Sequence, residues 1–550
     1  AYCVSDDNKI FTMIVKSPLP DVPIAEMNAS EFILQRLSRL PKRIGFIEGA
    51  TDRQYTYEEI IKLTKKVANN LYKRKLAKNE VMVMLVPNCL EFVPLALAVP
   101  LLGAIYSGVN PDYTVGEIDS YLTDCGVSRV LVTSKTLQKL KQTKVYSRIK
   151  EVYVTDSNER SGKVHPFTDL LQGDYERFPA QAKINPKTQP GYIFYSSGTT
   201  GMPKAALISH YNMVAACTIL THESVGMVPT NEIGVTQVVY PIFHAGGSLN
   251  MLMMMTAGFT AVIYPSYDYE TLLHNISKYK VTHGWLVPAI INRMAKDPKL
   301  DQYDLSSLTY MQHGSSPISQ DVIRTMQRRV PSLTRINHTY GMTENLAVCM
   351  GQYGNNNKAG SCGKPFPNTI AKVIDVSTGE MLGPNESGEI CTKSPGMMLG
   401  YLNKPKETAE TIDQDGWLHT GDIGYYDKYG NFFIVDRLKE LIKYKSFQVA
   451  PAELETVLLR HPAVMDVVVV GIPDERAGEV PKAFVVKKSD EAIAEAELQA
   501  FLAEQLIAYK HLRGGVEFVS EIPKAPSTGK PLRRVLREST IKRMAVSSKL

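Results

Sequence analysis

The sequence predicts an α/β fold with a large N-terminal domain of helix-covered, mostly parallel sheets, a β subdomain, and a small α+β C-terminal domain. Short β-rich runs alternate with helical runs as far as about Val330, which is typical of parallel sheets covered by helices. From residue 358 to 435 short strands are separated by Gly, Pro and Asn, which indicates the β subdomain. The last part, about 110 residues of mixed helix and strand, is long enough to fold independently.

The length sets the number of domains. A chain of 550 residues exceeds one ordinary core, so two or more domains are expected. We place an N-terminal domain at 1–435, with its β subdomain at about 358–435, a boundary at 436–439 and a C-terminal domain at 440–550. The formal net charge of +6 comes without long basic blocks, which argues against a dedicated nucleic-acid-binding protein.

The cysteines indicate the redox environment. There are seven, an odd number, far apart and without a CxxC pair. This spacing favours a reducing compartment and argues against both a disulfide framework and a zinc site.

Two uncharged runs, 92–111 and 241–267, are as long as a membrane span. Each contains Pro or several Gly and polar residues, so we expect a buried helix followed by a buried strand in both, and no membrane span. The N-terminal residues show no basic region followed by an apolar core, so no secretory signal is expected.

The first half of the N-terminal domain begins with a helix start at Thr56 to Glu59, which resembles a capping box. The apolar residues that follow recur at helical spacing. The further elements expected up to residue 220 are a strand at 81–86, helices from Leu90 and at 113–124, strands at 129–133 and 192–195, and a helix at 210–220.

The second half of that domain is expected to place loops at strand ends, where open α/β sheets bind ligands. We predict strands at 235–240, 282–287 and 307–312, a helix at 288–296, and loops at 243–247 and 313–317. The Met-rich segment 251–255 has the composition of plain core.

The C-terminal domain is expected to follow a strand at 431–435. Its predicted elements are a helix at 451–460, strands at 464–471 and 483–488, a helix at 491–504 and a strand at 516–519.

A phosphate cradle is predicted where the strand at 192–195 breaks into a Gly/Ser/Thr loop followed by Lys204. Glycines let backbone N–H groups approach an anion, hydroxyls add donors and the lysine adds positive charge. A Ser/Thr/Gly surface linker has the same composition. The loop is not a Walker loop, because Pro203 stands where that motif has Gly. The cradle residues are Ser196, Ser197, Gly198, Thr199, Thr200, Gly201 and Lys204.

The segment YSSGTTGMPK at 195–204 resembles the signature of the adenylate-forming superfamily, which includes acyl-CoA synthetases, 4-coumarate:CoA ligases and beetle luciferases. Further motifs of that superfamily follow in its order, namely YGMTE at 340–344, GWLHTGD at 416–422, DRLK at 436–439 and PSTGK at 526–530. The resemblance therefore spans most of the chain.

The resemblance implies roles for these motifs in binding ATP. The cradle would hold the β and γ phosphates, Thr343 would contact the α-phosphate region and Glu344 would bind Mg²⁺. Asp422 would accept both ribose hydroxyls, and Arg437 would contact ribose or phosphate. The adenine site would be formed by the loop with Gly314, Ser315 and Ser316 together with Tyr340 and Gly341.

The resemblance also implies two half-reactions that use two faces of a mobile C-terminal lid. Lys530 would reach the carboxylate and the α-phosphate during adenylation, and Lys443 lies in the segment that enters the site for thiol attack. Ser446 stands where this segment usually has Gly, which would alter the route of the CoA thiol.

His244, in the expected acyl pocket, is a further catalytic candidate, but the residues after it depart from the luciferase pattern. Ala245 and Gly247 stand where the family has bulky residues, so they are expected to leave room for a longer or wider substrate. The Met-rich segment 251–255 would be either the lining of an acyl tunnel or plain core.

We therefore expect an acid:CoA ligase that uses ATP, Mg²⁺ and CoA and activates a fatty or arylalkyl (4-coumarate-like) acid through an acyl adenylate. A luciferase or luciferase-like monooxygenase is the first alternative, and a non-enzymatic binder of nucleotide or acyl groups is the second. The final residues, Ser548-Lys549-Leu550, match the peroxisomal address, so we expect location in the peroxisome and binding to its import receptor.

Overall fold

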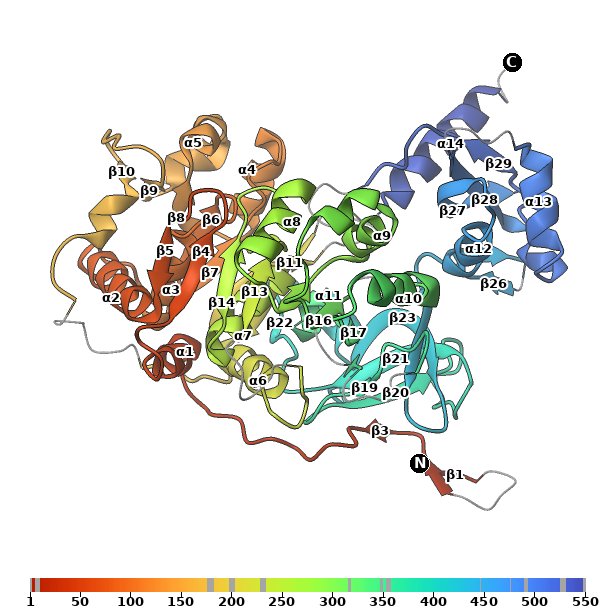
Figure 1. Cartoon of the computed structure of the whole chain (residues 1–550), viewed down its shortest axis with the longest axis horizontal. Helices are drawn as coiled ribbons and strands as arrows, with labels where there is room; N and C mark the ends of the chain where they lie inside the picture. Colours follow the sequence, from red (N-terminus) through yellow and green to blue (C-terminus); the bar gives the residue numbers. More distant parts are fainter. Residues whose placement is uncertain are drawn as a thin grey trace. The chain divides into compact units, whose positions relative to one another are not determined.

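The computed structural model describes residues 2–4, 10–175, 183–196, 203–227, 234–314, 318–346, 350–352, 358–445, 447–474, 476–488, 493–524 and 531–547 (Figure 1). The chain divides into two compact units. The larger unit comprises Ile14–Ala371 and Thr392–Leu418, and the smaller unit comprises Ala1–Met13, Lys372–Cys391 and His419–Leu550. The expected boundary at 436–439 stays a prediction.

The first large sheet of the larger unit has eight strands in the order β10-β9-β8-β6-β7-β11-β12-β22. The pairs from β10 to β11 are parallel, and the last two pairs are antiparallel. The strands are β10 (Val164–Pro166), β9 (Glu151–Val154), β8 (Val127–Val132), β6 (Val81–Leu85), β7 (Ile105–Gly108), β11 (Pro190–Ser196), β12 (Lys204–Ser209) and β22 (Gly400–Tyr401).

The second large sheet has nine strands in the order β19-β18-β17-β16-β15-β13-β14-β4-β5. The pairs from β17 to β4 are parallel, and the flanking pairs are antiparallel. The strands are β19 (Lys364–Pro365), β18 (Met350–Gly351), β17 (Arg335–Tyr340), β16 (Tyr310–His313), β15 (His283–Trp285), β13 (Val235–Val238), β14 (Thr260–Ile263), β4 (Ile44–Glu48) and β5 (Gln54–Thr56).

The central strand β6 of the first large sheet is buried on both faces, which explains why it is a continuous apolar run and not an alternating one. In β6, Met82 and Met84 face a central core shared with helices α1, α2, α3, α6 and α7. Val81, Val83 and Leu85 face an outer core with α4 and α5. The second sheet packs its outer face against α8, α9 and α10. The helices of the larger unit are α1 (Ala29–Leu37), α2 (Tyr57–Lys73), α3 (Phe92–Leu101), α4 (Val115–Asp124), α5 (Ser134–Lys141), α6 (His210–Leu220), α7 (Ala245–Ala257), α8 (Tyr269–Lys278), α9 (Pro288–Lys296), α10 (Gln320–Arg329) and α11 (Pro405–Thr411).

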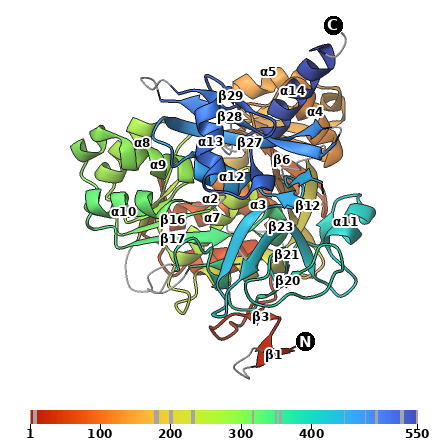
Figure 2. The same cartoon turned by 90° about the vertical axis from the view of Figure 1, so that its right-hand side faces the viewer.

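Two five-stranded sheets complete the chain, in the orders β24-β23-β21-β20-β3 and β26-β25-β28-β27, with β29 on β28. Figure 2 shows α12, α13 and α14 around the second of these sheets, whose core belongs to the smaller unit. The elements are β3 (Val15–Lys16), β20 (Ile370–Ile374), β21 (Gly388–Lys393), β23 (Leu418–Tyr426), β24 (Phe432–Arg437), β25 (Ile442–Tyr444), β26 (Phe447–Val449), α12 (Pro451–Leu458), β27 (Val464–Asp474), β28 (Gly478–Lys487), α13 (Glu495–Ala503), β29 (Val516–Phe518) and α14 (Arg533–Ser547). A separate hairpin joins β1 (Tyr2–Val4) to β2 (Ile10–Thr12).

Several sequence predictions are confirmed in detail. Thr56 and Glu59 form the expected capping box at the start of α2, and α6 spans the predicted 210–220. The two runs of membrane-span length fold as α3 followed by β7 and as α7 followed by β14. Among the described residues, no helix is long and apolar enough to cross a membrane.

Several predictions at element boundaries were wrong. The strand predicted at 483–488, for example, begins at Gly478 in β28. The predicted loop at 243–247 ends at His244, because α7 begins at Ala245 with His244 as its N-cap. The strand predicted to end at residue 435 continues through Arg437, because Asp422 pairs with Arg437 and Ile423 pairs with Asp436 across β23 and β24.

Gly246 and Gly247, two neighbouring glycines of α7, are predicted to respond differently to substitution by Ala. A Cβ at Gly247 would lie 2.0 Å from the carbonyl oxygen of Pro241, whereas a Cβ at Gly246 meets no atom within 4 Å. We expect Gly247→Ala to destabilise the protein by about 2–3 kcal/mol, because a backbone segment would have to move. Gly246→Ala should be neutral or stabilise by up to about 1 kcal/mol, because Ala favours helix. Thermal unfolding of both variants checks this, and equal melting temperatures would contradict it.

Asp436 yields a pH prediction for the smaller unit. Its carboxylate accepts hydrogen bonds from the backbone N–H groups of Arg437 (2.7 Å) and Ala452 (2.9 Å). Burial raises the pKa of Asp436 from 3.8 to about 6, with Arg533 opposing and Glu440 reinforcing the shift.

Because the pKa of Asp436 is higher in the folded state, its contribution to stability is fully present below the unfolded value of 3.8 and is lost as the pH rises through about 6. We expect a loss of roughly 2–3 kcal/mol across that window, since each pKa unit corresponds to about 1.4 kcal/mol. Asp436→Asn should flatten this part of the pH profile in urea unfolding. An unchanged slope in the variant would assign the effect to other groups.

Candidate functional site

The ends of the predicted phosphate cradle lie side by side in the larger unit. Strands β11 and β12 form an antiparallel pair in which Ser196 is opposite Lys204. Ser196 is buried, and it ends the strand that leads into the loop. The pairing therefore holds the hydroxyl and the ammonium group at one end of the hairpin. The cradle residues Ser197, Gly198, Thr199, Thr200 and Gly201 lie outside the described residues.

Tyr401 connects the cradle lysine to Glu344. Its hydroxyl donates a hydrogen bond of 2.7 Å to Oε1 of Glu344, and the Nζ of Lys204 lies 4.8 Å from the centre of its ring. Glu344 and Tyr401 are both buried, at 6% and 7% exposure. This arrangement brings a cation, an aromatic ring and a carboxylate into one cluster, within the range of a cation–π contact.

The backbone explains how Tyr401 comes to lie there. Strand β22 pairs with β12, so that Tyr401 is opposite Ala206 and Gly400 is opposite Leu207. The N–H of Tyr401 also donates to Oγ1 of Thr408 at 2.9 Å. Sequence reasoning did not identify Tyr401, and the Gly400-Tyr401 pair alone gives no signal that it reaches a residue so distant in the chain.

The electrostatics of the cluster keep the tyrosine protonated. Burial raises the pKa of Tyr401 far above its usual range, and the nearby Glu344 carboxylate raises it further. The hydroxyl therefore acts as a neutral donor. It orients the carboxylate without neutralising its charge.

Thr343 and Glu344 lie in a short 3₁₀ turn, η4 (Thr343–Asn345), that follows β17. The carbonyl of Glu344 accepts from the N–H of Met398 at 2.8 Å, and Nδ2 of Asn345 donates to Oγ1 of Thr392 at 3.2 Å. These two bonds attach the turn to the segment that contains Thr392 and Met398.

Part of the predicted adenine site is formed at the carboxyl ends of two neighbouring parallel strands. Gly314 directly follows β16, while Tyr340 ends β17 and Gly341 follows it. A Cβ at Gly314 would lie 3.1 Å from the carbonyl oxygen of Thr339, so the two backbones approach closely. This is the edge at which α/β sheets bind ligands. Ser315 and Ser316 lie outside the described residues.

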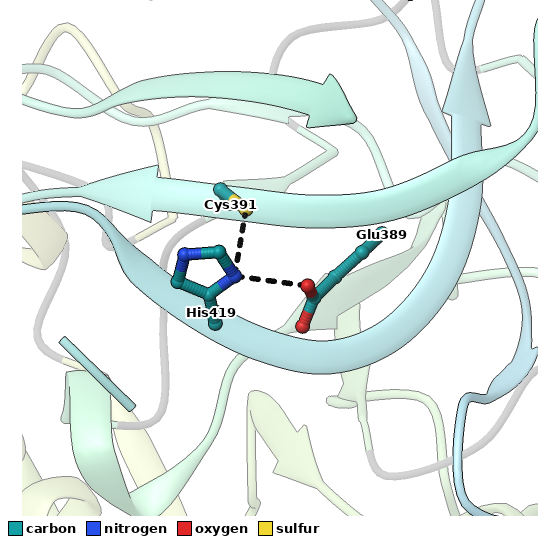
Figure 3. Close-up of side chains that lie close together, drawn as sticks. All are labelled: Glu389, Cys391 and His419. Atoms are coloured by element: carbon teal, nitrogen blue, oxygen red, sulfur yellow. Dashed lines mark hydrogen bonds and ion pairs between the residues drawn. The ribbon is translucent and has the colours of Figure 1, made fainter. Parts of the chain in front are cut away.

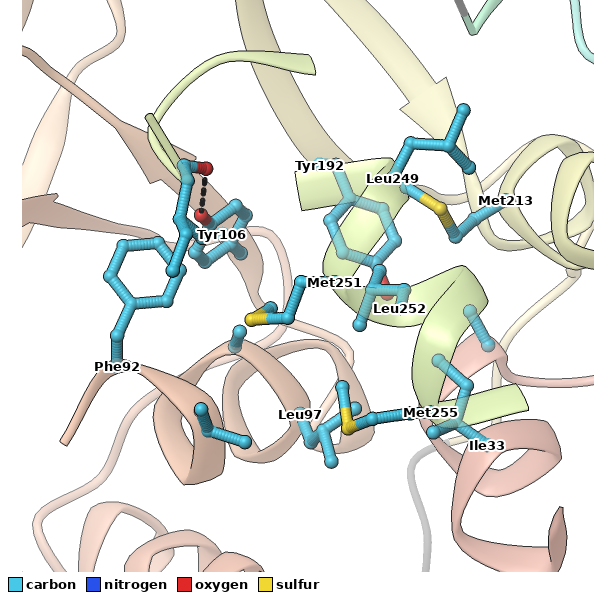
Figure 4. Close-up of a cluster of buried hydrophobic side chains, with 14 of the residues drawn as sticks. Ile33, Phe92, Leu97, Tyr106, Tyr192, Met213, Leu249, Met251, Leu252 and Met255 are labelled. Carbon is cyan, nitrogen blue, oxygen red and sulfur yellow. Dashed lines mark hydrogen bonds between the residues drawn. The ribbon is translucent and has the colours of Figure 1, made fainter. Parts of the chain in front are cut away.

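The predicted acyl-pocket residues are packed tightly. His244 caps α7, and its ring centre lies 4.7 Å from that of Phe243. Figure 4 shows Met251 and Met255 packed in the central core with Phe92 and Leu97. The expectation that Gly247 leaves room for substrate was wrong, because the backbone of Pro241 occupies the position that its side chain would take.

Three predicted residues lie in the smaller unit. Asp422 is buried in β23, and Nε of Arg437 on the paired strand β24 lies 3.5 Å from its Oδ1. Lys443 is exposed in β25, and its backbone N–H donates to Oε2 of Glu479 at 2.9 Å. Lys530 and Ser446 lie outside the described residues.

The larger unit also contains a pocket of about 660 Å³, lined by residues such as Lys16, Asn368 and Lys393. Among the predicted site residues that the structure describes, none lines it. We therefore do not assign it to ATP or to the acid.

The sequence of the chain matches two models of known protein families. The model described as AMP-binding enzyme matches residues 34–402, and the one described as AMP-binding enzyme C-terminal domain matches residues 453–530. A probable 4-coumarate–CoA ligase 1 of Dictyostelium discoideum is 37% identical, covering 95% of this chain and 97% of that protein. The 4-coumarate–CoA ligase of Pinus taeda is 38% identical, with the same coverage of 95% and 97%.

Solved structures show the same fold. ATP-bound MatB from Rhodopseudomonas palustris superposes with a TM-score of 0.84 at 26% identity, covering 93% of this chain and 99% of that chain. The anthranilate CoA ligase AuaEII superposes with a TM-score of 0.85 at 24% identity, covering 95% of this chain and 99% of that chain. At this identity the likeness shows the fold alone. On these matches the chain belongs to the AMP-binding enzyme family, that is, to the adenylate-forming superfamily, and within it to the AMP-forming acid:CoA ligases.

Proposed function

We propose that this acid:CoA ligase activates an arylalkyl, 4-coumarate-like or fatty carboxylic acid through an acyl adenylate and transfers it to CoA. The observation that carries the adenylation step is the cluster of Lys204, Tyr401 and Glu344 beside the phosphate hairpin. The two relatives named as 4-coumarate–CoA ligases support the class of acid.

In the first half-reaction a carboxylate oxygen of the acid attacks the α-phosphorus of ATP, and pyrophosphate leaves. An anion approaches a polyanion, so the barrier depends on positive charge placed where negative charge develops. Lys204, held opposite Ser196 at the mouth of the loop, supplies such a charge to the β and γ phosphates. Thr343, adjacent to Glu344 in the 3₁₀ turn, contacts the α-phosphate region in this proposal.

The carboxylate of Glu344 fits Mg²⁺, which prefers hard oxygen ligands. It is buried, and its partner at Oε1 is the neutral hydroxyl of Tyr401, which leaves the negative charge in place. Bound there, Mg²⁺ would neutralise charge on the phosphate oxygens of ATP. Asp422, paired with Arg437, is the proposed acceptor of the ribose hydroxyls.

In the second half-reaction the CoA thiol attacks the carbonyl carbon of the adenylate, and AMP leaves. Lys530 is proposed for the first step and Lys443 for the second, so the two steps use different residues. Location in the peroxisome and binding to its import receptor through Ser548-Lys549-Leu550 stay predictions. These three residues lie outside the described residues.

Tyr401→Phe tests the cluster. The variant keeps the ring that contacts Lys204 and removes the hydroxyl that orients Glu344. We expect the rate of ATP-dependent pyrophosphate release to fall about 10- to 100-fold, because a hydrogen bond to a charged group contributes about 1.5–3 kcal/mol. Tyr429→Phe, at a position 64% exposed, is the matched control and should retain full activity. Equal rates for the two variants would remove Tyr401 from the mechanism.

The overall reaction is tested by measuring pyrophosphate release with ATP and Mg²⁺ across fatty acids, cinnamates and luciferin. Each acid is assayed with and without CoA while photons are counted. We expect CoA-dependent turnover of cinnamic or fatty acids, formation of their thioesters and no light. Light from luciferin, or pyrophosphate release that is independent of CoA, would support the luciferase alternative instead. No turnover of any acid, with ATP still bound, would support the non-enzymatic binder.

A further inference from the structure

The smaller unit contains a cluster of three side chains that could bind a metal ion, namely Glu389, Cys391 and His419 (Figure 3). They offer a carboxylate oxygen, a sulfur and a ring nitrogen. Nδ1 of His419 lies 2.9 Å from Oε2 of Glu389 and 3.6 Å from Sγ of Cys391. All three ligand atoms lie within 4.8 Å of one another. His419 belongs to the GWLHTGD segment at 416–422, but no step described above assigns a role to its side chain or to those of Glu389 and Cys391.

The backbone places the cluster on two neighbouring strands. Glu389 and Cys391 are two residues apart on β21, so their side chains lie on the same face of the sheet. His419 lies on β23, which is next to β21 in the sheet order. Oγ1 of Thr420 donates to the carbonyl of Ile390 at 2.7 Å, which fixes the two strands against each other.

The geometry does not fit a nucleophilic triad. In such a triad the nucleophile contacts one ring nitrogen of histidine and the carboxylate contacts the other. Here the thiol and the carboxylate both approach the same nitrogen, Nδ1. A single nitrogen carries one proton and cannot relay it between two partners, so the cluster is not arranged for thiol catalysis.

The same convergence suits a metal ion. With Zn–S near 2.3 Å and Zn–N and Zn–O near 2.0–2.2 Å, tetrahedral ligand atoms are separated by about 3.3–3.6 Å. The distance of 3.6 Å between Sγ of Cys391 and Nδ1 of His419 falls in this range. The distance of 2.9 Å between Nδ1 and Oε2 of Glu389 would have to increase slightly. Thiolate, imidazole and carboxylate together favour Zn²⁺ over hard cations such as Mg²⁺.

The surroundings orient the ligands and leave a path of entry. The second oxygen of Glu389, Oε1, accepts from the backbone N–H of Gly421 at 3.0 Å, the kind of outer contact that fixes a metal-binding carboxylate. Cys391 is fully buried, whereas the His419 side chain is 27% exposed. An ion would therefore enter past the imidazole and reach the thiol last.

We propose that Glu389 Oε2, Cys391 Sγ and His419 Nδ1 form a binding site for one Zn²⁺ ion, with a water as the fourth ligand. Binding displaces the thiol proton of Cys391 to solvent, and the proton of the neutral His419 ring is on Nε2 when Nδ1 holds the ion, so uptake of one metal ion releases the thiol proton. The sequence argument against a zinc site rested on the wide spacing of the cysteines. It considered only sites built from several thiols. Here a single cysteine is completed by a histidine and a glutamate from the fold.

Metal titration of the full-length, metal-free protein tests this site. We expect one equivalent of Co²⁺ to produce a thiolate-to-cobalt charge-transfer band, Zn²⁺ to displace it, and excess Mg²⁺ to leave it unchanged. Cys391→Ser should abolish the band. His419→Gln, at a partly exposed position, should weaken Zn²⁺ binding by about tenfold or more.

Cys125→Ser is the matched control, because Cys125 is also a buried free cysteine. It lies in the larger unit, whereas Glu389 and His419 lie in the smaller unit. The Cys125→Ser variant should bind Co²⁺ as the unaltered protein does. Absence of the band at one equivalent, or its persistence in Cys391→Ser, would overturn the proposal. Circular dichroism checks whether Cys391→Ser folds. If it does not fold, the test depends on His419→Gln, and Zn²⁺ binding as tight as in the unaltered protein would overturn the proposal. The titration does not measure ligase activity, so its failure would leave the proposed function standing.

Discussion

The hydrogen bonds between β12 and β22 hold the phosphate hairpin and the acidic turn together. They place Tyr401 opposite Ala206, two residues beyond Lys204 on the same strand. From that position one side chain contacts both the cradle lysine and Glu344, which lies far from Lys204 in the sequence. Without this edge pairing the cation and the carboxylate would belong to separate loops. The chemistry proposed for ATP thus depends on a short antiparallel edge added to an otherwise mostly parallel sheet.

The elements that follow local rules could be predicted from the sequence. The capping box at Thr56 and the apolar strand β6 have local signatures, since a cap needs residues three apart and a strand buried on both faces is a continuous apolar run. The predicted loop at Ala245 to Gly247 failed because glycines are typical of loops. Here Gly247 lies in a helix, and its lack of a side chain allows the backbone of Pro241 to approach.

The candidate site was predictable only in part, because some of its contacts are local in the sequence and others join distant segments. Lys204, Glu344 and Asp422 belong to motifs whose spacing along the chain is fixed, so a resemblance could identify them. Tyr401 and the cluster at His419 arise from strand pairing between distant segments, and no local pattern encodes such contacts. The Met-rich segment shows why composition alone leaves alternatives open. Its composition allowed a tunnel or a core, and the packing of Met251 and Met255 places them in the core.

The pairing of β12 with β22 also has a consequence for the order in which the protein is assembled. A ribosome releases Lys204–Ser209 long before it releases Gly400–Tyr401, so the outer edge of β12 lacks its partner during that interval. At typical rates of synthesis the delay is about 10 to 40 s. An open strand edge in an incomplete chain invites pairing with other chains. The nascent larger unit is therefore expected to depend on chaperones until its last strand emerges, although the finished sheet has that edge covered.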